Sequence, residues 1–191
     1  MARWFRAARV RPIGRWGSGP DVQFHLVHDL GAPLASVEAA LASPRLGALL
    51  VARQPRLVSV EQTEMSRRGE TLTRVLHVRG RAPLFVPSRA LPPAALEWDE
   101  RFVYDLRRHE AVFEALPAPV YRRWVTCTAA WRLESTGART CRRSVAGRID
   151  VRAGWMSVML SRFATSEVRT TYDAEAVVLE ELALDAQPLA P

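Results

Sequence analysis

The chain has 191 residues, of which 48% are hydrophobic and 25% are charged, the balance of one soluble globular domain with a sizeable core. No run of about 18 apolar residues is present to span a bilayer, and the arginine-rich start lacks the apolar stretch of a secretory signal. We therefore expect a cytoplasmic protein.

The positive charge is concentrated at the start of the chain. All 27 cationic residues are arginine and the formal net charge is +7, and residues 1–20 hold five of these arginines and no acid: Arg3, Arg6, Arg9, Arg11 and Arg15. In residues 21–191 the other 22 arginines face 20 acids, so the charge balance does not indicate the basic face of a nucleic-acid-binding module. We expect residues 1–20 to be a disordered tail without a specific nucleic-acid partner. Contact with an anionic membrane or RNA through its arginines is the alternative.

The first eighty residues predict a strand, two short helices and a hairpin. Residues 22–28 alternate like a strand, with every second side chain apolar. Residues 33–42 and 44–53 each open with proline and are rich in alanine and leucine, which favours two short helices. Residues 56–67 and 71–79 are rich in β-branched residues and are joined around Gly69, as in a hairpin.

The middle of the chain predicts further strands. Four prolines exclude a regular element from residues 82–95 and make them a candidate entrance loop. Residues 96–106 alternate, with Glu100 as the polar exception on the apolar face, and residues 111–116 predict a short strand. Residues 121–133 and 141–151 predict a second hairpin that turns at residues 135–137.

The two cysteines lie on opposite arms of that second hairpin. With the turn centred near Thr136, four residues of strand separate Cys127 from Cys141, about 13 Å. A disulfide needs Cα atoms within roughly 7 Å. We therefore expect two free thiols.

The last part of the chain, from Gly154 to about Leu184, has apolar residues at helical spacing and predicts one long helix, with Thr170 and Thr171 as the place for a bend. In its first half the spacing puts Trp155 or Met156, Met159, Leu160 and Phe163 on the side that faces the strands. The same spacing puts Ser157, Ser161 and Arg162 off that stripe.

The order of elements predicts an α+β fold in which a curved antiparallel sheet grips the long C-terminal helix, with two short helices after the first strand. This order, together with Asp29-Leu30-Gly31-Ala32-Pro33 after the first strand and the strand that starts Leu96-Glu97-Trp98-Asp99-Glu100, resembles the START-like (SRPBCC) helix-grip superfamily. That superfamily includes birch-pollen-allergen proteins and polyketide cyclases. The similarity covers residues 21–184 and leaves residues 1–20 and 185–191 as disordered ends.

The resemblance implies a hollow between the sheet and the terminal helix that holds lipids, sterols, polyketides or other apolar molecules. Large apolar side chains are core residues by default, but in this fold part of the core is the wall of the hollow. The resemblance therefore makes seven residues candidates for ligand binding: Trp98, Phe102, Tyr104, Trp131, Trp155, Met159 and Phe163.

Motifs of the common catalytic and metal sites are missing from the sequence. It contains no phosphate-binding glycine loop, no Gly-x-Ser-x-Gly elbow and no His-Glu-x-x-His helix. The odd spacing of His25 and His28 on one strand sends their imidazoles to opposite faces, so they do not share one ion. His77 and His109 stand alone, and we expect neither a metal nor a cofactor.

The acid–base candidate is Glu100. If it points into the hollow, burial raises its pKa into the range that a cyclase or dehydratase uses; pairing with an arginine or a position on the rim is the structural alternative. The sequence thus predicts a protein that binds or carries an apolar or amphipathic small molecule. A polyketide cyclase-like enzyme that uses Glu100 is the alternative, and a membrane- or RNA-interacting module is a further one.

Overall fold

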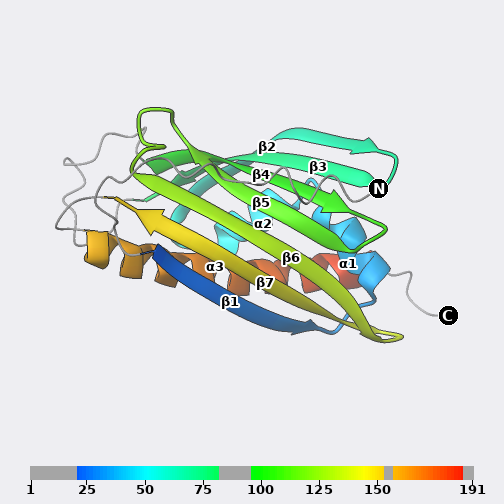
Figure 1. Cartoon of the computed structure of the whole chain (residues 1–191). Helices are drawn as coiled ribbons and strands as arrows, with labels where there is room; N and C mark the ends of the chain where they lie inside the picture. Colours follow the sequence, from blue (N-terminus) through cyan, green and yellow to red (C-terminus); the bar gives the residue numbers. More distant parts are fainter. Residues whose placement is uncertain (1–20, 82–95, 153–156, 187–191) are drawn as a thin grey trace.

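A seven-stranded antiparallel sheet curves around one long helix in the computed structural model, which describes residues 21–81, 96–152 and 157–186 (Figure 1). The strands are β1 (Asp21–Leu30), β2 (Leu57–Arg68), β3 (Thr71–Gly80), β4 (Glu97–Asp105), β5 (Glu110–Pro117), β6 (Val125–Gly137) and β7 (Thr140–Val151). The helices are α1 (Leu34–Leu41), α2 (Leu46–Arg53) and α3 (Ser157–Asp185). The predicted fold class is therefore confirmed. The predicted tail, entrance loop and Trp155 lie outside the described residues.

The strand order is β1-β7-β6-β5-β4-β3-β2, so β2 to β7 form a meander and β1 closes onto β7. Gly69 makes the tight turn between β2 and β3 with a φ of 57°, a left-handed conformation that glycine adopts without steric cost. Helices α1 and α2 carry the chain from one edge of the sheet to the other and pack against α3. The sheet thus has a concave face that holds the helices.

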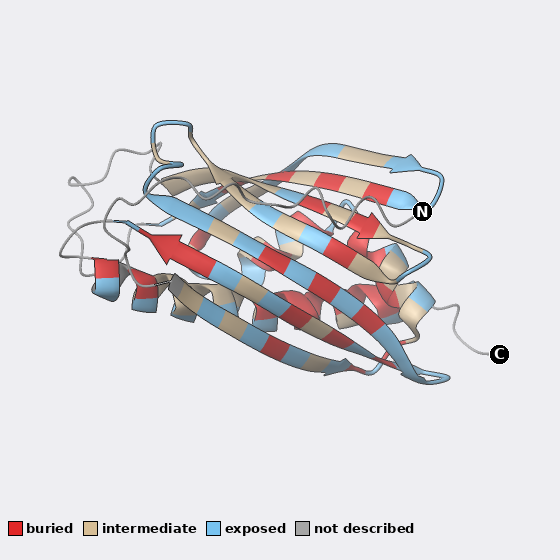
Figure 2. Ribbon diagram, in the orientation of Figure 1, coloured by how far each residue is buried: buried red, intermediate tan, exposed pale blue. Residues whose placement is uncertain are grey.

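Burial alternates along the strands, as a sheet with one covered face requires (Figure 2). In β3 the even-numbered residues from Leu72 to Val78 are buried, and in β7 the odd-numbered residues Cys141, Arg143 and Val145 are buried. Beside α1 and the end of α3 the concave face carries fully buried side chains such as Tyr104 and Leu133. This closed end is solid core.

None of the described helices is by itself both long and apolar enough to cross a membrane. The bent pair α1 and α2 reaches that length and composition only when the two helices are taken together, with an angle of 91° between them. Both helices bury apolar residues in the core, among them Val37, Leu41 and Leu50.

The turn of the second hairpin lies closer to the C-terminus than the predicted residues 135–137. Gly137 pairs with Thr140, so the chain turns at Ala138 and Arg139. A turn centred at Thr136 would pair Cys127 with Val145, whereas Cys127 pairs with Ile149. The shift is four residues. Because side chains alternate with a period of two, an even shift leaves the same residues on the concave face, and the apolar pattern could not detect it.

Helix α3 runs without interruption through Thr170 and Thr171, but its buried side differs from the prediction. Ser157 and Ser161 are buried, whereas Phe163 is only half-buried. Residues three or four positions apart lie on the same side of a helix. Counting back in this way from the buried residues Leu179 and Tyr172 reaches Ser161 and Ser157, so these serines lie on the same side. The packing of the second half therefore sets which side of the first half faces the sheet. In the sequence, the apolar residues 158–160 and 163 fall at several angles around a helix, so their spacing singles out no one side.

A buried ion cluster joins α3 to two distant strands. Arg143 of β7, with none of its side chain exposed, donates from Nη1 to Oε2 of Glu175 at 3.1 Å. Arg74 of β3, also buried, lies 3.5 Å from the other oxygen of Glu175. In the sheet, β4, β5 and β6 separate β3 from β7. The curvature of the sheet thus brings both arginines to one carboxylate.

Further contacts hold these two guanidinium groups. Arg143 also donates to the backbone carbonyl of Tyr172 and stacks 4.7 Å above the Trp131 ring. Arg74 donates to the carbonyl of Leu41 at 3.1 Å. Burial lowers the pKa of Arg143, and the charge of Glu175 opposes this shift. Loss of that carboxylate would leave two buried cations without a counter-charge.

We expect Glu175→Gln to lower the free energy of unfolding by about 3–5 kcal/mol, the usual cost of removing one partner from a buried ion pair. Glu181→Gln is the matched control on the same helix, because Glu181 pairs with Arg53 at the surface; its loss is expected to cost less than about 1 kcal/mol. Urea unfolding measures both. Equal losses for the two variants would contradict the role of the cluster.

We expect Cys127 and Cys141 to be recovered as free thiols in a non-reducing peptide map of fresh protein, in line with their free state in the structure. Ile149, the partner of Cys127, lies eight residues along β7 from Cys141, about 26 Å at 3.3 Å per residue. A Cys127–Cys141 crosslink in that map would show that the strand register is wrong.

Candidate binding site

The concave face is sealed at the closed end and partly accessible at the other. At this accessible end, several side chains point to the concave face, because they alternate in step with buried residues on the same strands. These side chains are only half-buried. They are Phe24, Trp98, Glu100, Phe113, Ala115 and Cys127. We call this set the open end. Register supports the grouping, because Glu100 pairs with Ala115 and Ala115 pairs with Cys127.

Glu100 is the acid of the open end. It points to the same side of β4 as Trp98, whose Nε1 donates to Oε1 of Glu100 at 2.9 Å. Burial raises the pKa of the Glu100 carboxyl to about 7, and the charge of Glu175 adds to the shift, while the Trp98 hydrogen bond and the charge of Arg74 oppose it. Glu100 therefore exchanges its proton near neutral pH.

The other polar groups near Glu100 stay protonated. Burial raises the pKa of the Cys127 thiol to about 12, and the charge of Glu100 adds to that shift. Burial also raises the pKa of Tyr172 well above its usual value, and its hydroxyl accepts a hydrogen bond from Nε1 of Trp131 at 3.5 Å. A thiol with so high a pKa is a poor nucleophile at neutral pH.

The described candidates from the sequence fall into three places. Trp98 lies at the open end beside Glu100. Phe102, Tyr104 and Trp131 are buried, and the rings of Phe102 and Trp131 meet edge to face with centroids 4.9 Å apart. Phe163 is half-buried on α3 beneath the guanidinium of Arg56, 5.5 Å from the ring centroid. Trp155 and the side chain of Met159 lie outside the described residues.

Tyr104 does not converge with Glu100. Its hydroxyl donates to Oε1 of Glu38 on α1 at 2.7 Å, and His109 binds the same oxygen at 2.8 Å. This arrangement fastens α1 to β4 and to the turn after it. Tyr104 therefore has a structural partner at the closed end.

The histidines are engaged elsewhere or exposed. His28 lies 2.9 Å from Asp173 and His77 lies 2.9 Å from Asp99. His25 is exposed while His28 is half-buried, which agrees with the prediction that they point to opposite faces. Within the described ranges, no group of three or more His, Cys, Asp or Glu side chains could hold a metal ion.

The buried ion cluster was not predicted, and of the open-end residues only Trp98 and Glu100 were predicted as site residues. Arg143 and Arg74 break apolar stretches on β7 and β3, the same signal that singled out Glu100 on β4. Phe113 and Phe24 could have been found by counting every second residue along their strands, because each points to the same face as buried neighbours.

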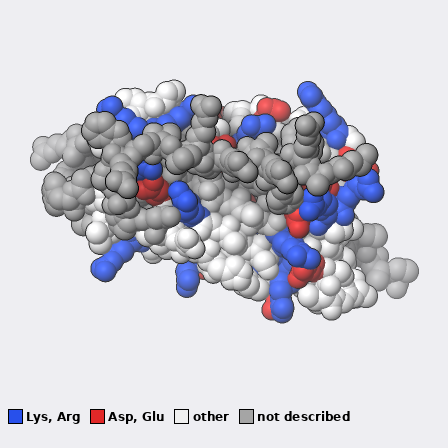
Figure 3. Space-filling view, viewed as in Figure 1, with Lys and Arg blue, Asp and Glu red and all other residues white. Residues whose placement is uncertain are grey.

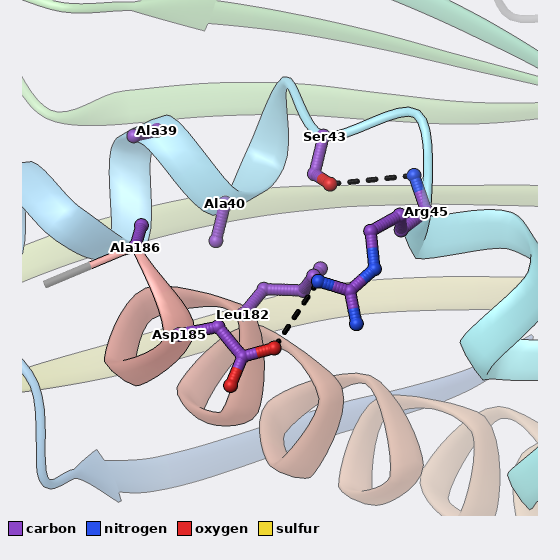
Figure 4. Close-up of a pocket in the computed structure, with 7 residues that line it drawn as sticks. All are labelled: Ala39, Ala40, Ser43, Arg45, Leu182, Asp185 and Ala186. Carbon is purple, nitrogen blue, oxygen red and sulfur yellow. Dashed lines mark hydrogen bonds and ion pairs between the residues drawn. The ribbon is translucent and has the colours of Figure 1, made fainter.

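A surface pocket lies at the closed end (Figure 4). It has a volume of about 320 Å³, and Arg45 spans it with a hydrogen bond to Asp185 at 3.1 Å. The lining residues come from α1, the α1–α2 connection and the end of α3: Ala39, Ala40, Ser43, Arg45, Leu182, Asp185 and Ala186. This pocket contains none of the open-end residues.

No protein-family model matches the chain, and no curated protein matches it in sequence. Solved structures do match. The Zhui aromatase/cyclase from Streptomyces sp. R1128 has a TM-score of 0.61 and 15% identity over 86% of this chain and 94% of that one. Norcoclaurine synthase from Thalictrum flavum, in complex with dopamine and hydroxybenzaldehyde, has a TM-score of 0.58 and 15% identity over 95% of this chain and 99% of that one.

A third match is the di-domain ARO/CYC BexL from the BE-7585A biosynthetic pathway, with a TM-score of 0.55 and 17% identity over 88% of this chain and 51% of that one. At such low identities the likeness is one of fold. The chain therefore has the START-like helix-grip fold that its sequence resembles.

Proposed function

We propose that the protein binds an apolar or amphipathic small molecule at the open end, between the concave face of the sheet and α3. The observation that carries this proposal is the partial exposure of side chains on the concave face. Their same-parity neighbours Phe102, Ala129 and Ile149 are buried. Accessible apolar surface inside a curved sheet is the usual setting of a ligand site.

The chemistry of the open end favours a ligand with an aromatic or otherwise flat apolar body. Phe24, Trp98 and Phe113 offer rings, and Glu100 is the acid among them. The matched structures support this class, since one is an aromatase/cyclase and another is in complex with dopamine and hydroxybenzaldehyde. Few polar groups among many apolar ones orient a ligand without dominating its binding.

A second candidate function is acid–base catalysis by Glu100, as in a cyclase or dehydratase. The observation that favours it is the raised pKa of about 7, which suits a general acid or base at neutral pH. As a carboxylate, Glu100 would accept a proton from a carbon beside a carbonyl group. As a carboxylic acid, it would donate a proton to a hydroxyl group that leaves as water.

We expect Ala115→Phe to weaken binding of a neutral apolar fluorescent probe, N-phenyl-1-naphthylamine, at least tenfold, because the new ring occupies the space that the probe fills. Ala130→Phe is the matched control, since Ala130 is exposed on the outer face of β6. Fluorescence titration measures the affinity, and urea unfolding measures the stability of each variant.

The same two measurements can contradict the binding proposal. If the concave face is solid core at this end, the wild-type protein binds no probe and the Ala115→Phe variant loses about 1–3 kcal/mol of stability from overpacking. A binding site instead tolerates the ring with little loss of stability.

We expect Glu100→Gln to remove a pH-dependent part of the stability. An acid whose pKa is higher in the folded state binds more protons when folded, so its contribution to the free energy of unfolding falls as pH rises from about 4.5 to about 7. Between pH 5 and pH 8 the wild type should lose about 1–3 kcal/mol more than the variant. Identical pH profiles would show that Glu100 is solvated, which argues against its catalytic role.

A further inference from the structure

The loop that joins β5 to β6 exposes large apolar side chains. It projects beyond the sheet at the upper left of Figure 1. Val120 is 59% exposed, Trp124 is 43% exposed and Val125, the first residue of β6, is 37% exposed. An exposed tryptophan grouped with two exposed valines is an unusual concentration for a surface facing water only. We call residues 118–125 the β5–β6 loop.

The same loop is locally basic. Arg122 and Arg123 are exposed, and residues 115–133 contain no acid. Among the described residues neither arginine has an ion pair: Arg122 donates to the carbonyl of Pro117 at 3.0 Å, and Arg123 lies 4.9 Å above the Trp124 ring. Elsewhere on the face shown in Figure 3, acidic side chains lie among the basic ones.

Backbone hydrogen bonds fix the shape of the loop. The Tyr121 amide donates to the carbonyl of Ala118 at 2.8 Å, and the Trp124 amide donates to the carbonyl of Tyr121 at the same distance. The carbonyl of Trp124 in turn accepts a bond from the Arg152 amide at 2.7 Å. The aromatic and basic side chains are therefore presented together without a large ordering cost on binding.

We propose that the β5–β6 loop binds the surface of an anionic membrane. Tryptophan prefers the boundary between lipid headgroups and acyl chains, valine gains from burial there, and arginine contacts lipid phosphates while its stem covers apolar surface. A nucleic acid would use the two arginines and the tryptophan but would leave Val120 and Val125 without a partner. This inference goes beyond small-molecule binding and stands on separate observations.

The position of the loop links it to the candidate site. It follows β5 directly after the residues Ala115 to Pro117 and leads into β6 two residues before Cys127, and Pro117 pairs with Trp98. Both ends of the loop therefore continue from the open end. A membrane bound there would lie beside the accessible part of the concave face.

The test is flotation of the full chain with vesicles of phosphatidylcholine alone or with about 30% phosphatidylglycerol. We expect binding to the anionic vesicles and a loss of at least about tenfold in Arg122→Glu/Arg123→Glu and in Val120→Ser/Trp124→Ser. Matched controls are Arg107→Glu, in the turn at the other end of β5, and Val112→Ser, whose parent side chain is 57% exposed on the outer face. These should bind like the wild type. Unfolding midpoints show that every variant is folded.

Three outcomes would overturn the proposal. The wild type could fail to bind anionic vesicles. The loop variants could bind them as well as the wild type, and replacement of Arg3, Arg6, Arg9, Arg11 and Arg15 by Gln would then show whether the N-terminal arginines supply the affinity. Finally, the protein could bind a single-stranded RNA homopolymer. Loss of that RNA binding in Arg122→Glu/Arg123→Glu, with unchanged RNA binding in Val120→Ser/Trp124→Ser, would identify a nucleic-acid contact.

Discussion

The carboxylate of Glu175 is the point on which the architecture depends. Two buried arginines from strands on distant parts of the sheet reach it, and a buried charge is stable only while its partner is present. This requirement fixes the distance between α3 and the sheet midway along the helix. On one side of the cluster the space is filled by Tyr104, Leu133 and the short helices. On the other side the concave face is partly accessible.

That division gives the fold two ends with different chemistry. At the closed end the buried Tyr104 hydroxyl donates a hydrogen bond to Glu38 of α1, and apolar side chains such as Leu133 fill the space around it. At the open end, Trp98 donates a hydrogen bond to the carboxyl of Glu100, and burial raises the pKa of that carboxyl to about 7. Ligand binding and proton exchange are both compatible with this arrangement, and they differ in whether Glu100 changes its charge when the ligand is present.

The spacing of apolar residues and the positions of proline and glycine were enough to predict the strands, the two short helices and the terminal helix, because these signals are local. Register was not predictable for β6 and β7, since a shift of four residues keeps Cys127 and Cys141 on the concave face. The buried side of the first half of α3 was missed because it depends on the packing of Tyr172, which lies in the second half of the helix. Arg143 was missed because a charged residue within an apolar pattern gives no indication of its partner.

The central claim is that the open end, and not the surface pocket between α1 and α3, holds the ligand. Amide chemical-shift mapping by NMR during titration with N-phenyl-1-naphthylamine tests it most directly. The account predicts the largest changes at Trp98, Glu100, Phe113, Ala115 and Cys127, with Ala39 and Leu182 unchanged. Changes confined to Ala39, Ser43 and Leu182, or none in the sheet, would contradict it.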